Sequence, residues 1–531
     1  MSLLRYNLDY LATLLHECGV THWAVSPGSR NAPIVAGLIR HGGFQLHSFP
    51  DERSAAFAAL GMSQGRGFTC GVICTSGTAS LNLYPAICEA YYQRVPLLAI
   101  TADRPAELID QWDGQVIHQK NLFEKHILAS YETPQDLHET ELNQELDSIV
   151  RAAVKRSLQP DKGPVHINIP LKDPIYKNSQ QIFKHIPGIQ PLVFLRNAFP
   201  KAIPSEIQER LKNARKILFL SGQNLPDAGL MMAARQVAAK FPLIEDVTAN
   251  LGGVGINRID NALHLKVPDA ELAPDCLITF GLSVLSKPLK KFIQQHPPVF
   301  HLHLSTGGFT GDPFKSSPVT LACEPAEILD YLHNTLTAND NFLEQWQNYA
   351  ATCASQDYSK DAEYRFVKIF LQSCKPADCI HLGNSMTVRY ASLSGECNGL
   401  IFCNRGTSGI DGSLSTAVGY ALAHPEKQVY CLLGDISFFY DVNGLWTDTL
   451  PTNLGIIVQN NFGGAIFNKI DGPSEVPTLM PWIATPHRRS AAAVANDYKI
   501  PFYKYRGSER TAPRVSQLST PYICEVIYES K

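Results

Sequence analysis

Short apolar runs alternate with helical patterns along most of the chain. In the first third the runs are "THWAVS", "FQLHSF", "CGVICTS", "PLLAITA" and "GPVHINIP". Between them, apolar residues recur at helical spacing, as in "IVAGLIRH". Strands that alternate with helices are typical of parallel α/β sheets. The pattern therefore predicts one α/β domain over residues 1–178.

Two further domains of the same kind are expected. The runs "KILFLSGQN", "PLIEDVT", "CLITFG" and "VFHLHLS" predict a central domain over residues 200–335. The runs "CIHLGN", "GLIFCNR", "QVYCLLGD", "LGIIVQN" and "PYICEVIYE" predict a third over residues 355–531. A polar, proline-containing stretch at 177–204 predicts a linker, and 334–356 a helical connector. The expected fold class is α/β, with three doubly wound parallel-sheet domains.

Composition removes several classes of function. The 531 residues are 45% hydrophobic and 18% charged, with a net charge of −3, so several cores can form and no basic surface for nucleic acid is expected. The thirteen cysteines include no C-x-x-C pair, which favours reduced core thiols over a zinc site. No apolar stretch approaches the ~20 residues of a membrane span, and the start lacks a secretory apolar segment. We expect a cytoplasmic protein.

Two polar pairs follow apolar runs in the third predicted domain. Gly434-Asp435 ends one run, and Asn460-Asn461 ends the next, shortly before Gly463. If the two strands are parallel neighbours, these groups meet at the carboxyl edge of the sheet, where such sheets bind ligands. Carboxylate, amide and backbone oxygens suit Mg²⁺ that also holds a diphosphate. Either pair alone is an ordinary turn; the two together favour a metal site.

Two charged residues in the first predicted domain also follow strands. In "PDERSAAFAALG", Glu52 precedes a helix of small residues that is able to pack closely. Asp51 and Glu52 fit a helix N-terminus by charge alone, whereas beside a cofactor Glu52 would hold a proton. In "SPGSRNAP", Arg30 is either a solvated charge or a clamp for an anionic ligand.

Together these motifs resemble those of thiamine diphosphate enzymes. The ordered set "SPGSRNAP", "DERSAAFAALG", "CTSGTASLNLYPA", "TADRPAEL", "NSMTVR", "NRGTSGIDG" and "NNFGGAIF" is similar to the 2-succinyl-5-enolpyruvyl-6-hydroxy-3-cyclohexene-1-carboxylate synthase family of menaquinone biosynthesis. The resemblance covers most of residues 1–170 and 380–470 and is thin in the middle. It implies a transferase that decarboxylates 2-oxoglutarate and adds the succinyl carbanion to isochorismate. It also implies thiamine diphosphate, Mg²⁺ or Mn²⁺, and a homodimer or tetramer with active sites between subunits.

The resemblance assigns roles to individual residues. It implies a pyrimidine-binding first domain, whose Glu52 is catalytic, and a diphosphate- and metal-binding third domain. The implied metal ligands are Asp435, Asn461 and Gly463. The implied substrate-binding residues are Ser29, Arg30, Arg104, Gln115, Lys287, Ser385, Arg389 and Arg405. The implied cofactor-binding residues are Ile410, Gly434, Asp435, Ile436, Ser437, Asn461, Ile466 and Phe467.

Three residues depart from the family pattern, and other interpretations stay open. Gly114, Pro288 and Phe462 stand where some relatives have other residues, which puts one substrate hydrogen bond and one basic contact in question. A thiamine-dependent 2-oxoacid decarboxylase or acetohydroxyacid synthase shares the fold and metal motif. A non-catalytic homologue would be expected to lack Glu52 or Asp435. A nicotinamide or flavin enzyme would need the glycine fingerprint that the middle domain lacks. Residues 468–489 fit either a mobile cover or an ordered surface loop.

Overall fold

Two compact units make up the chain. The computed structural model describes residues 3–135, 137, 141–159, 161–173, 175, 189–192, 203–259, 270–308, 310–356, 358–395, 397–469, 472–507 and 515–528. One unit comprises residues 1–197, 406–426 and 439–453, and the other 198–405, 427–438 and 454–531. Most of the expected linker at 177–204 lies outside the described residues.

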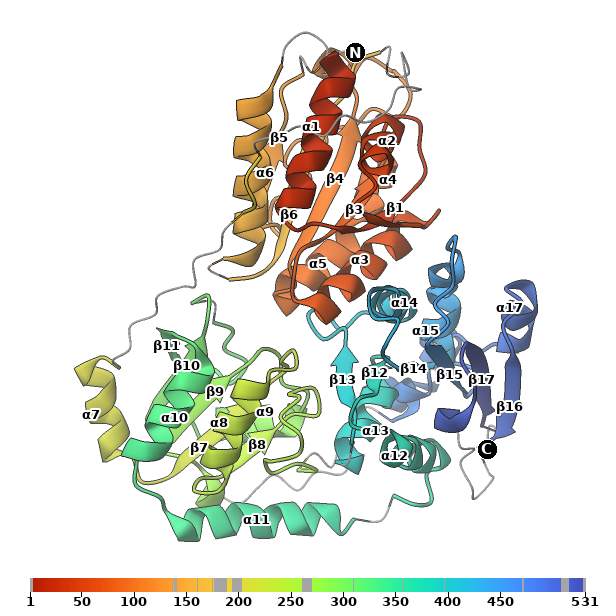
Figure 1. The fold of residues 1–531 in the computed structure, drawn as a ribbon. Coiled ribbons are helices and arrows are strands. Elements are labelled where there is room, and N and C mark those ends of the chain that lie inside the picture. Colours follow the sequence, from red (N-terminus) through yellow and green to blue (C-terminus); the bar gives the residue numbers. More distant parts are fainter. Residues whose placement is uncertain are drawn as a thin grey trace. The chain divides into compact units, whose positions relative to one another are not determined.

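The first unit is built on a six-stranded parallel sheet, here sheet A, with strand order β2-β1-β3-β4-β6-β5 (Figure 1). Its strands are β1 (His22–Val25), β2 (Gln45–Ser48), β3 (Cys70–Cys74), β4 (Leu97–Asp103), β5 (Ala129–Glu132) and β6 (Pro164–Pro170). The central strands β3, β4 and β6 are buried at every position, because helices cover both faces.

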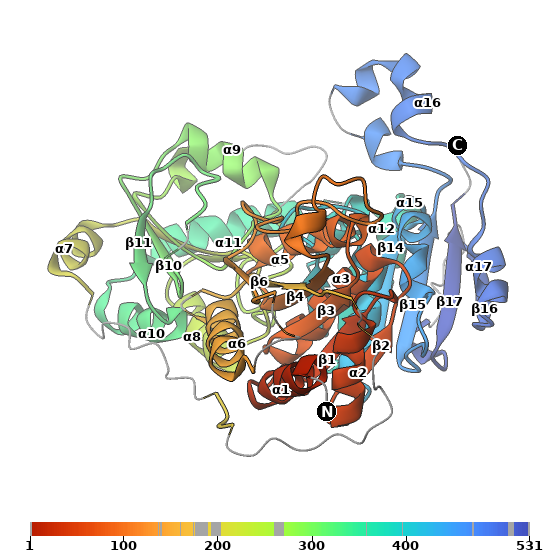
Figure 2. The same cartoon turned by 90° about the horizontal axis from the view of Figure 1, so that it is seen from above.

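The helices of the first unit fall on two sides of sheet A (Figure 2). One side carries α1 (Leu3–Glu17), α2 (Ala32–His41) and α6 (Asn143–Leu158), whose apolar residues share a core with β4 and β6. The other carries α3 (Glu52–Arg66) and α5 (Tyr84–Gln93), preceded by α4 (Thr78–Asn82). The unit also contains α14 (Ser413–Ala423) and the short turns η1 (Ala106–Leu108) and η3 (Val442–Leu445).

Small residues bring α3 and α14 into close contact within the first unit. A Cβ atom built on Gly61 would lie 2.0 Å from the carbonyl oxygen of Thr416, and one built on Gly419 would lie 1.9 Å from that of Ala58. No side chain fits at either position, so the two glycines set the distance between the helices. The expected close packing of the small-residue helix after Glu52 is confirmed.

In the second unit, sheet B has the order β11-β10-β9-β7-β8. Its strands are β7 (Ile217–Ser221), β8 (Leu243–Glu245), β9 (Cys276–Phe280), β10 (Phe300–Ser305) and β11 (Val319–Ala322). Alternate residues of β7 point to opposite faces: Phe219 joins a core with α7 (Ser205–Asn213), α8 (Ala228–Ala238) and α10 (Pro325–Thr335). Leu218 joins a core with α9 (Lys287–Gln295) and α11 (Asp340–Ala354), and η2 (Ala270–Leu272) contributes to it. The predicted helical connector corresponds to α11.

Sheet C of the second unit has the order β13-β12-β14-β15-β17-β16. Its strands are β12 (Cys379–Leu382), β13 (Leu400–Cys403), β14 (Val429–Gly434), β15 (Leu454–Asn460), β16 (Phe502–Arg506) and β17 (Tyr522–Ile527). One face packs on α12 (Ala362–Ser373) and α13 (Met386–Ser394). The remaining elements are α15 (Asp435–Tyr440), η4 (Ala465–Asn468), η5 (Pro473–Glu475), η6 (Pro477–Leu479), α16 (Met480–Ile483), α17 (Ala491–Asp497) and η7 (Val515–Gln517).

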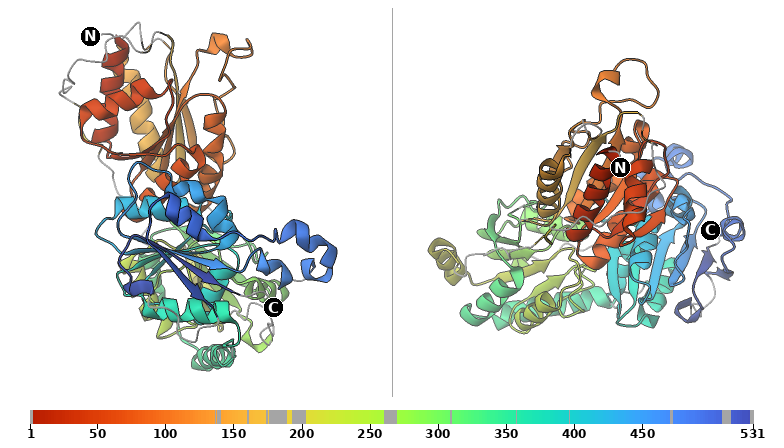
Figure 3. Two further views of the ribbon diagram at one scale, coloured as in Figure 1. Left: turned by 90° about the vertical axis from the view of Figure 1, so that its right-hand side faces the viewer. Right: turned by 45° about the horizontal axis from the view of Figure 1, so that its top comes forward.

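The predicted α/β class with three parallel sheets is confirmed. The sequence did not predict strands β5, β11 and β16. The segment with η5, η6 and α16 consists of short turns that stand off sheet C (Figures 2 and 3), and its Trp482 is 82% exposed. Within the described residues no helix combines the length and apolar character needed to cross a bilayer. All thirteen cysteines are free thiols.

Candidate active site

The two polar pairs of sheet C come together at its carboxyl edge. β14 and β15 are parallel neighbours, so Asp435 and Asn461 follow adjacent strand ends, as the sequence predicts. One carboxylate oxygen of Asp435, Oδ2, accepts the backbone N–H groups of Asn461 (3.2 Å) and Gly463 (3.0 Å). Its other oxygen accepts the N–H of Ile436 at 2.7 Å. The loop after β15 is therefore folded around this carboxylate.

The same loop is closed by the chain that returns after α16. Gly463 lies so near the carbonyl oxygen of Ala484 that a Cβ atom there would be 2.7 Å away, and its φ of +156° also favours glycine. The Nε2 atom of His487 lies 3.3 Å from Oδ2 of Asp435. Burial raises the pKa of Asp435, while His487 and the surrounding N–H groups oppose that shift.

The oxygen atoms of this loop fit a divalent cation. Oδ1 of Asn461 is buried and accepts no hydrogen bond within the described part of the chain, which is costly unless a ligand occupies it. No heavy atom lies within 4 Å of a Cβ built on Gly434, so the backbone at the end of β14 faces open space. No group of three or more His, Cys, Asp or Glu side chains suited to a metal occurs among the described residues. An Asp–Asn–carbonyl oxygen set is a different type of site, one that suits Mg²⁺.

Four cations gather in the second unit. Lys287 is exposed at the start of α9, while Lys290, Arg389 and Arg405 are half-buried. The pKa of Lys290 is lowered, first by burial and then by the positive charges of Arg405, Lys287 and Arg389, while the negative charge of Asp246 opposes the shift. Three cations predicted from the sequence thus lie close enough to repel a fourth that sequence reasoning missed. Its signal was its position three residues after Lys287, on the same helical face.

Two residues predicted to bind substrate, Ser385 and Arg389, lie at the end of the loop after β12 and on the helix that follows it. Ser385 precedes α13 with a φ of +76°, and Arg389 follows one turn later on that helix. Arg405 donates a hydrogen bond from Nη1 to Oδ1 of Asn384 at 3.0 Å, and Asn384 in turn donates to the carbonyl oxygen of Asn404 at 2.7 Å. The arginine is thereby oriented by the loop that carries Ser385.

The cofactor-binding residues predicted in the second unit lie close in sequence to Asp435 or to the loop after β15 that is hydrogen-bonded to it. Ser437 is buried and Ile436 half-buried on α15, directly after Asp435. Ile466 is partly buried against the core that covers sheet C. The ring of Phe467 lies beside Gly464, within 3.0 Å of where a Cβ would stand. Each of these residues is thus within a few positions of the oxygen cluster.

Glu52 begins α3 in the first unit. The Asp51 side chain caps this helix, accepting the N–H groups of Arg53 (2.9 Å) and Ser54 (3.2 Å), which leaves the Glu52 carboxyl free of the capping role. Burial raises the pKa of Glu52. Burial and then the negative charge of Glu52 raise the pKa of the Cys74 thiol, so Glu52 lies near the end of β3. A half-buried carboxyl with a raised pKa is suited to holding a proton.

Arg30 and Arg104 follow strands of sheet A and differ in their partners. Arg30 is buried; it donates to the carbonyl oxygen of Leu171 at 2.9 Å and pairs with Asp173 at 3.2 Å. The half-buried Arg104 follows Asp103, whose carboxylate accepts its backbone N–H. The Nε atoms of both arginines are buried without a hydrogen-bond partner among the described residues. Each arginine thus keeps a donor that an anion is able to accept.

The remaining predicted residues of the first unit lie on loops. Ser29 is exposed in a turn held by a hydrogen bond from Asn31 Nδ2 to the carbonyl oxygen of Ser26, and Gln115 is exposed with a φ of +59°. Ile410 is half-buried on the loop that precedes α14. Buried Glu89 anchors that loop by accepting the N–H groups of residues 406 and 407, each at 2.7 Å.

Comparisons with known proteins identify the enzymes that this chain resembles. A family model described as thiamine pyrophosphate enzyme, N-terminal TPP binding domain, matches residues 8–125. The 2-succinyl-5-enolpyruvyl-6-hydroxy-3-cyclohexene-1-carboxylate synthase of Cytophaga hutchinsonii is 38% identical over 92% of this chain and 89% of its own. The synthases of the same name from Desulfotalea psychrophila and Bacteroides thetaiotaomicron are 36% and 34% identical, covering 94% and 98% of this chain and 94% of their own.

Proposed function

The chain belongs to the 2-succinyl-5-enolpyruvyl-6-hydroxy-3-cyclohexene-1-carboxylate synthase family, and we propose that it catalyses the reaction of that name. It decarboxylates 2-oxoglutarate and joins the resulting four-carbon unit to isochorismate, with release of CO₂. Three relatives at 34–38% identity over more than nine-tenths of the chain support this function.

The cation cluster of Lys287, Lys290, Arg389 and Arg405 is the observation that favours this reaction over its alternatives. Both substrates are dicarboxylates, and arginine binds carboxylates through two parallel hydrogen bonds. Like charges at close range repel, and half-buried cations lose hydration; Asp246 offsets part of this cost, and bound carboxylates would offset more of it. A simple decarboxylase releases a neutral aldehyde, so it has no comparable need for four cations.

Residues predicted from the sequence would hold the cofactor and the metal. When bound, thiamine diphosphate supplies the electron sink that decarboxylation of a 2-oxo acid requires. Asp435, Asn461 and the carbonyl of Gly463 would hold Mg²⁺ or Mn²⁺, while Gly434, Ile436, Ser437, Ile410, Ile466 and Phe467 would contact the cofactor. Glu52 would hold a proton on the pyrimidine ring, since burial favours its protonated form. Arg30, Arg104, Ser29, Gln115 and Ser385 would orient the substrates.

Domain roles and assembly are part of the same proposal. Residues 1–178 would bind the pyrimidine, 200–335 would form the central domain, and 355–531 would bind the diphosphate and metal. The protein would act in the cytoplasm as a homodimer or tetramer with active sites between subunits. Thirteen free cysteines support a reducing compartment.

The test supplies the purified chain with thiamine diphosphate, Mg²⁺ and 2-oxoglutarate, with and without isochorismate. We expect CO₂ release coupled to formation of the adduct, and loss of nearly all turnover in Glu52→Gln, about 10²–10⁴-fold for a general acid–base group. A wild-type-like circular dichroism spectrum of that variant is the control. Rapid CO₂ release without adduct would identify a decarboxylase instead, and full activity of Glu52→Gln would refute the role of Glu52.

A further inference from the structure

The amide of Asn461 is held in one orientation by a residue outside the predicted site. Its Nδ2 donates a hydrogen bond to Oε1 of Glu363 at 3.0 Å. A carboxylate only accepts hydrogen bonds, so the amide nitrogen must face Glu363 and the amide oxygen must point the other way. That oxygen is the buried Oδ1 that accepts no hydrogen bond from the described residues.

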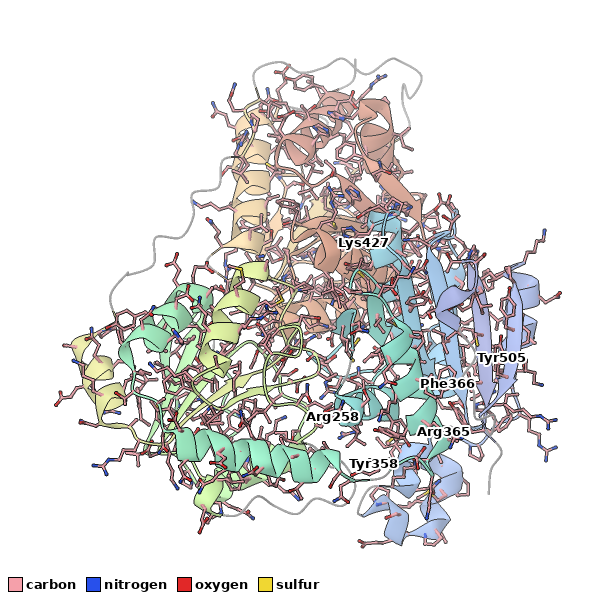
Figure 4. The ribbon with its side chains drawn as sticks, turned by 60° about the horizontal axis from the view of Figure 1, so that its bottom comes forward. Arg258, Tyr358, Arg365, Phe366, Lys427 and Tyr505 are labelled. Atoms are coloured by element: carbon pink, nitrogen blue, oxygen red, sulfur yellow. The ribbon has the colours of Figure 1, made fainter. Side chains whose placement is uncertain are left out.

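Glu363 is itself fixed by the start of α12. The Asp361 side chain caps this helix by accepting the N–H groups of Glu363 (3.0 Å) and Tyr364 (3.2 Å). Arg365, labelled with Phe366 on this helix in Figure 4, donates to the carbonyl oxygens of Ser359 (2.7 Å) and Gly507 (3.1 Å). The carboxylate therefore stands on a helix that is tied to the rest of its unit by several bonds.

Lys469 joins the start of α12 to the Asp435 loop. Its Nζ pairs with Oδ2 of Asp361 at 3.0 Å. Both ends of the contact between helix and loop are defined by charged groups.

The preceding asparagine shows what the same arrangement looks like when every group is satisfied. Asn460 donates from Nδ2 to Oε1 of Glu525 at 2.8 Å, as Asn461 does to Glu363. Its Oδ1, however, accepts the N–H of Phe462 at 3.0 Å. Two adjacent asparagines are each held by a glutamate, and only the second presents a buried oxygen without a donor.

We propose that Glu363 is a positioning residue of the metal site: it binds the Asn461 amide nitrogen and thereby aims Oδ1 at the divalent cation. The inference rests on the proposed function, which makes Asn461 a metal ligand. Groups that orient a ligand from behind typically affect metal affinity by about 10–100-fold when removed. Without Glu363 the amide would be free to turn its nitrogen, which binds no cation, toward the metal.

Mg²⁺-dependent binding of thiamine diphosphate, measured by titration calorimetry without substrate, tests this role. In Glu363→Ala we expect the Mg²⁺ concentration for half-saturation to rise about 10–100-fold. Glu363→Gln, which keeps an acceptor oxygen, should stay within about threefold of wild type, because the role is to accept a hydrogen bond. Lys368→Ala, a change on the same helix, is the matched control and should bind Mg²⁺ as wild type does.

The outcomes separate this inference from the proposed function. If wild type binds thiamine diphosphate with Mg²⁺ and Glu363→Ala does so equally well, Glu363 has no positioning role and the proposed function stands. If Glu363→Gln is as impaired as Glu363→Ala, charge rather than amide orientation matters and the inference is refuted. If wild type itself binds no thiamine diphosphate, both fail. Thermal melting of each variant shows whether a loss of binding reflects unfolding.

Discussion

Sheets A and C each have an asparagine near the carboxyl end of one strand, and the two asparagines differ in their surroundings. Asn168, in β6, donates from Nδ2 to Asp103 (2.8 Å) and Glu132 (3.1 Å). Its Oδ1 accepts from Thr101 at 2.8 Å and Gln119 at 3.2 Å. Asn461, after β15, donates to Glu363 but accepts nothing at Oδ1 among the described residues.

The comparison separates a polar group that stabilises the fold from one that awaits a ligand. A fully satisfied buried network gains from low local dielectric and fixes one arrangement of the strands. A buried oxygen without a donor lowers stability and persists only where something else requires it. Removal of Asn168 should therefore cost stability, and removal of Asn461 should cost ligand binding.

The largest effect is expected at Asn461 and Asp435, the predicted metal ligands of sheet C. Asn461→Ala and Asp435→Ala should each weaken Mg²⁺-dependent binding of thiamine diphosphate by at least about 100-fold, since each removes a ligand itself rather than a group behind it. Asn461→Ala removes the donor to Glu363 but also a buried oxygen that lacks a donor among the described residues, so its melting temperature should fall by less than that of Asn168→Ala. Calorimetric titration with Mg²⁺ and thermal melting measure the two quantities. Unchanged Mg²⁺ affinity would remove Asn461 from the metal site.

Asn168, whose amide is fully hydrogen-bonded, should show the opposite pattern: lower stability with unchanged Mg²⁺ binding. Asn168→Ala leaves the carboxylates of Asp103 and Glu132 without their shared donor and should destabilise the fold by about 2–4 kcal/mol. For a domain of ordinary size this corresponds to roughly 5–10 °C in melting temperature. Mg²⁺ affinity of the folded variant should match wild type. A variant that melts as wild type does while losing Mg²⁺ binding would reverse the comparison.

A smaller, pH-dependent effect should come from the same network. His166 is fully buried, with its ring nitrogens 2.7 Å from Thr101 Oγ1 and 3.0 Å from Ser130 Oγ, and burial lowers its pKa to about 3. Its unfolded pKa is about 6.5, so the unfolded state binds the proton more readily. Stability is then complete above about pH 6.5 and falls, by up to about 1.4 kcal/mol per pH unit, as the pH drops toward 3.

His166→Asn should remove this contribution. Between pH 6.5 and 5.0 its stability should fall by about 2 kcal/mol less than that of wild type. Urea midpoints at several pH values provide the measurement, and the difference between variant and wild type isolates this residue from the other histidines. Equal loss of stability in both proteins would show that His166 takes up no proton on unfolding.

The strands that the sequence failed to predict share one position. β5, β11 and β16 are each an edge strand of their sheet. None is buried throughout: every residue of β5 is half-buried, β11 has one buried residue, and β16 has only exposed and half-buried residues. A strand that is not covered on both faces needs few apolar residues, so these edge strands carry a weak pattern, although the edge strands β2 and β13 were predicted.

Some residues of the candidate site could likewise be predicted from the sequence pattern, and others only from the packing of the fold. Asp435, Asn461 and Glu52 stand next to apolar runs, so strand ends alone pointed to them. Lys290 and Glu363 do not follow strands, and each lies on a helix whose partner is distant in the chain: Glu363 is 98 residues from Asn461. Glu363 has no local sequence signal that distinguishes it from a solvated helix residue, and the signal of Lys290 was only its position three residues after Lys287.

The sequence by itself determined the alternation of strands and helices, the α/β class and the oxygen-bearing strand ends, because these depend on periodicity and on residues within one turn of each other. The tertiary structure alone decided which oxygen of the two asparagines remains without a donor and which cations gather around Lys290. The physical reason is that hydrogen-bond saturation and charge repulsion act over a few ångströms in space. Residues far apart along the chain meet at that range only once the sheets have formed.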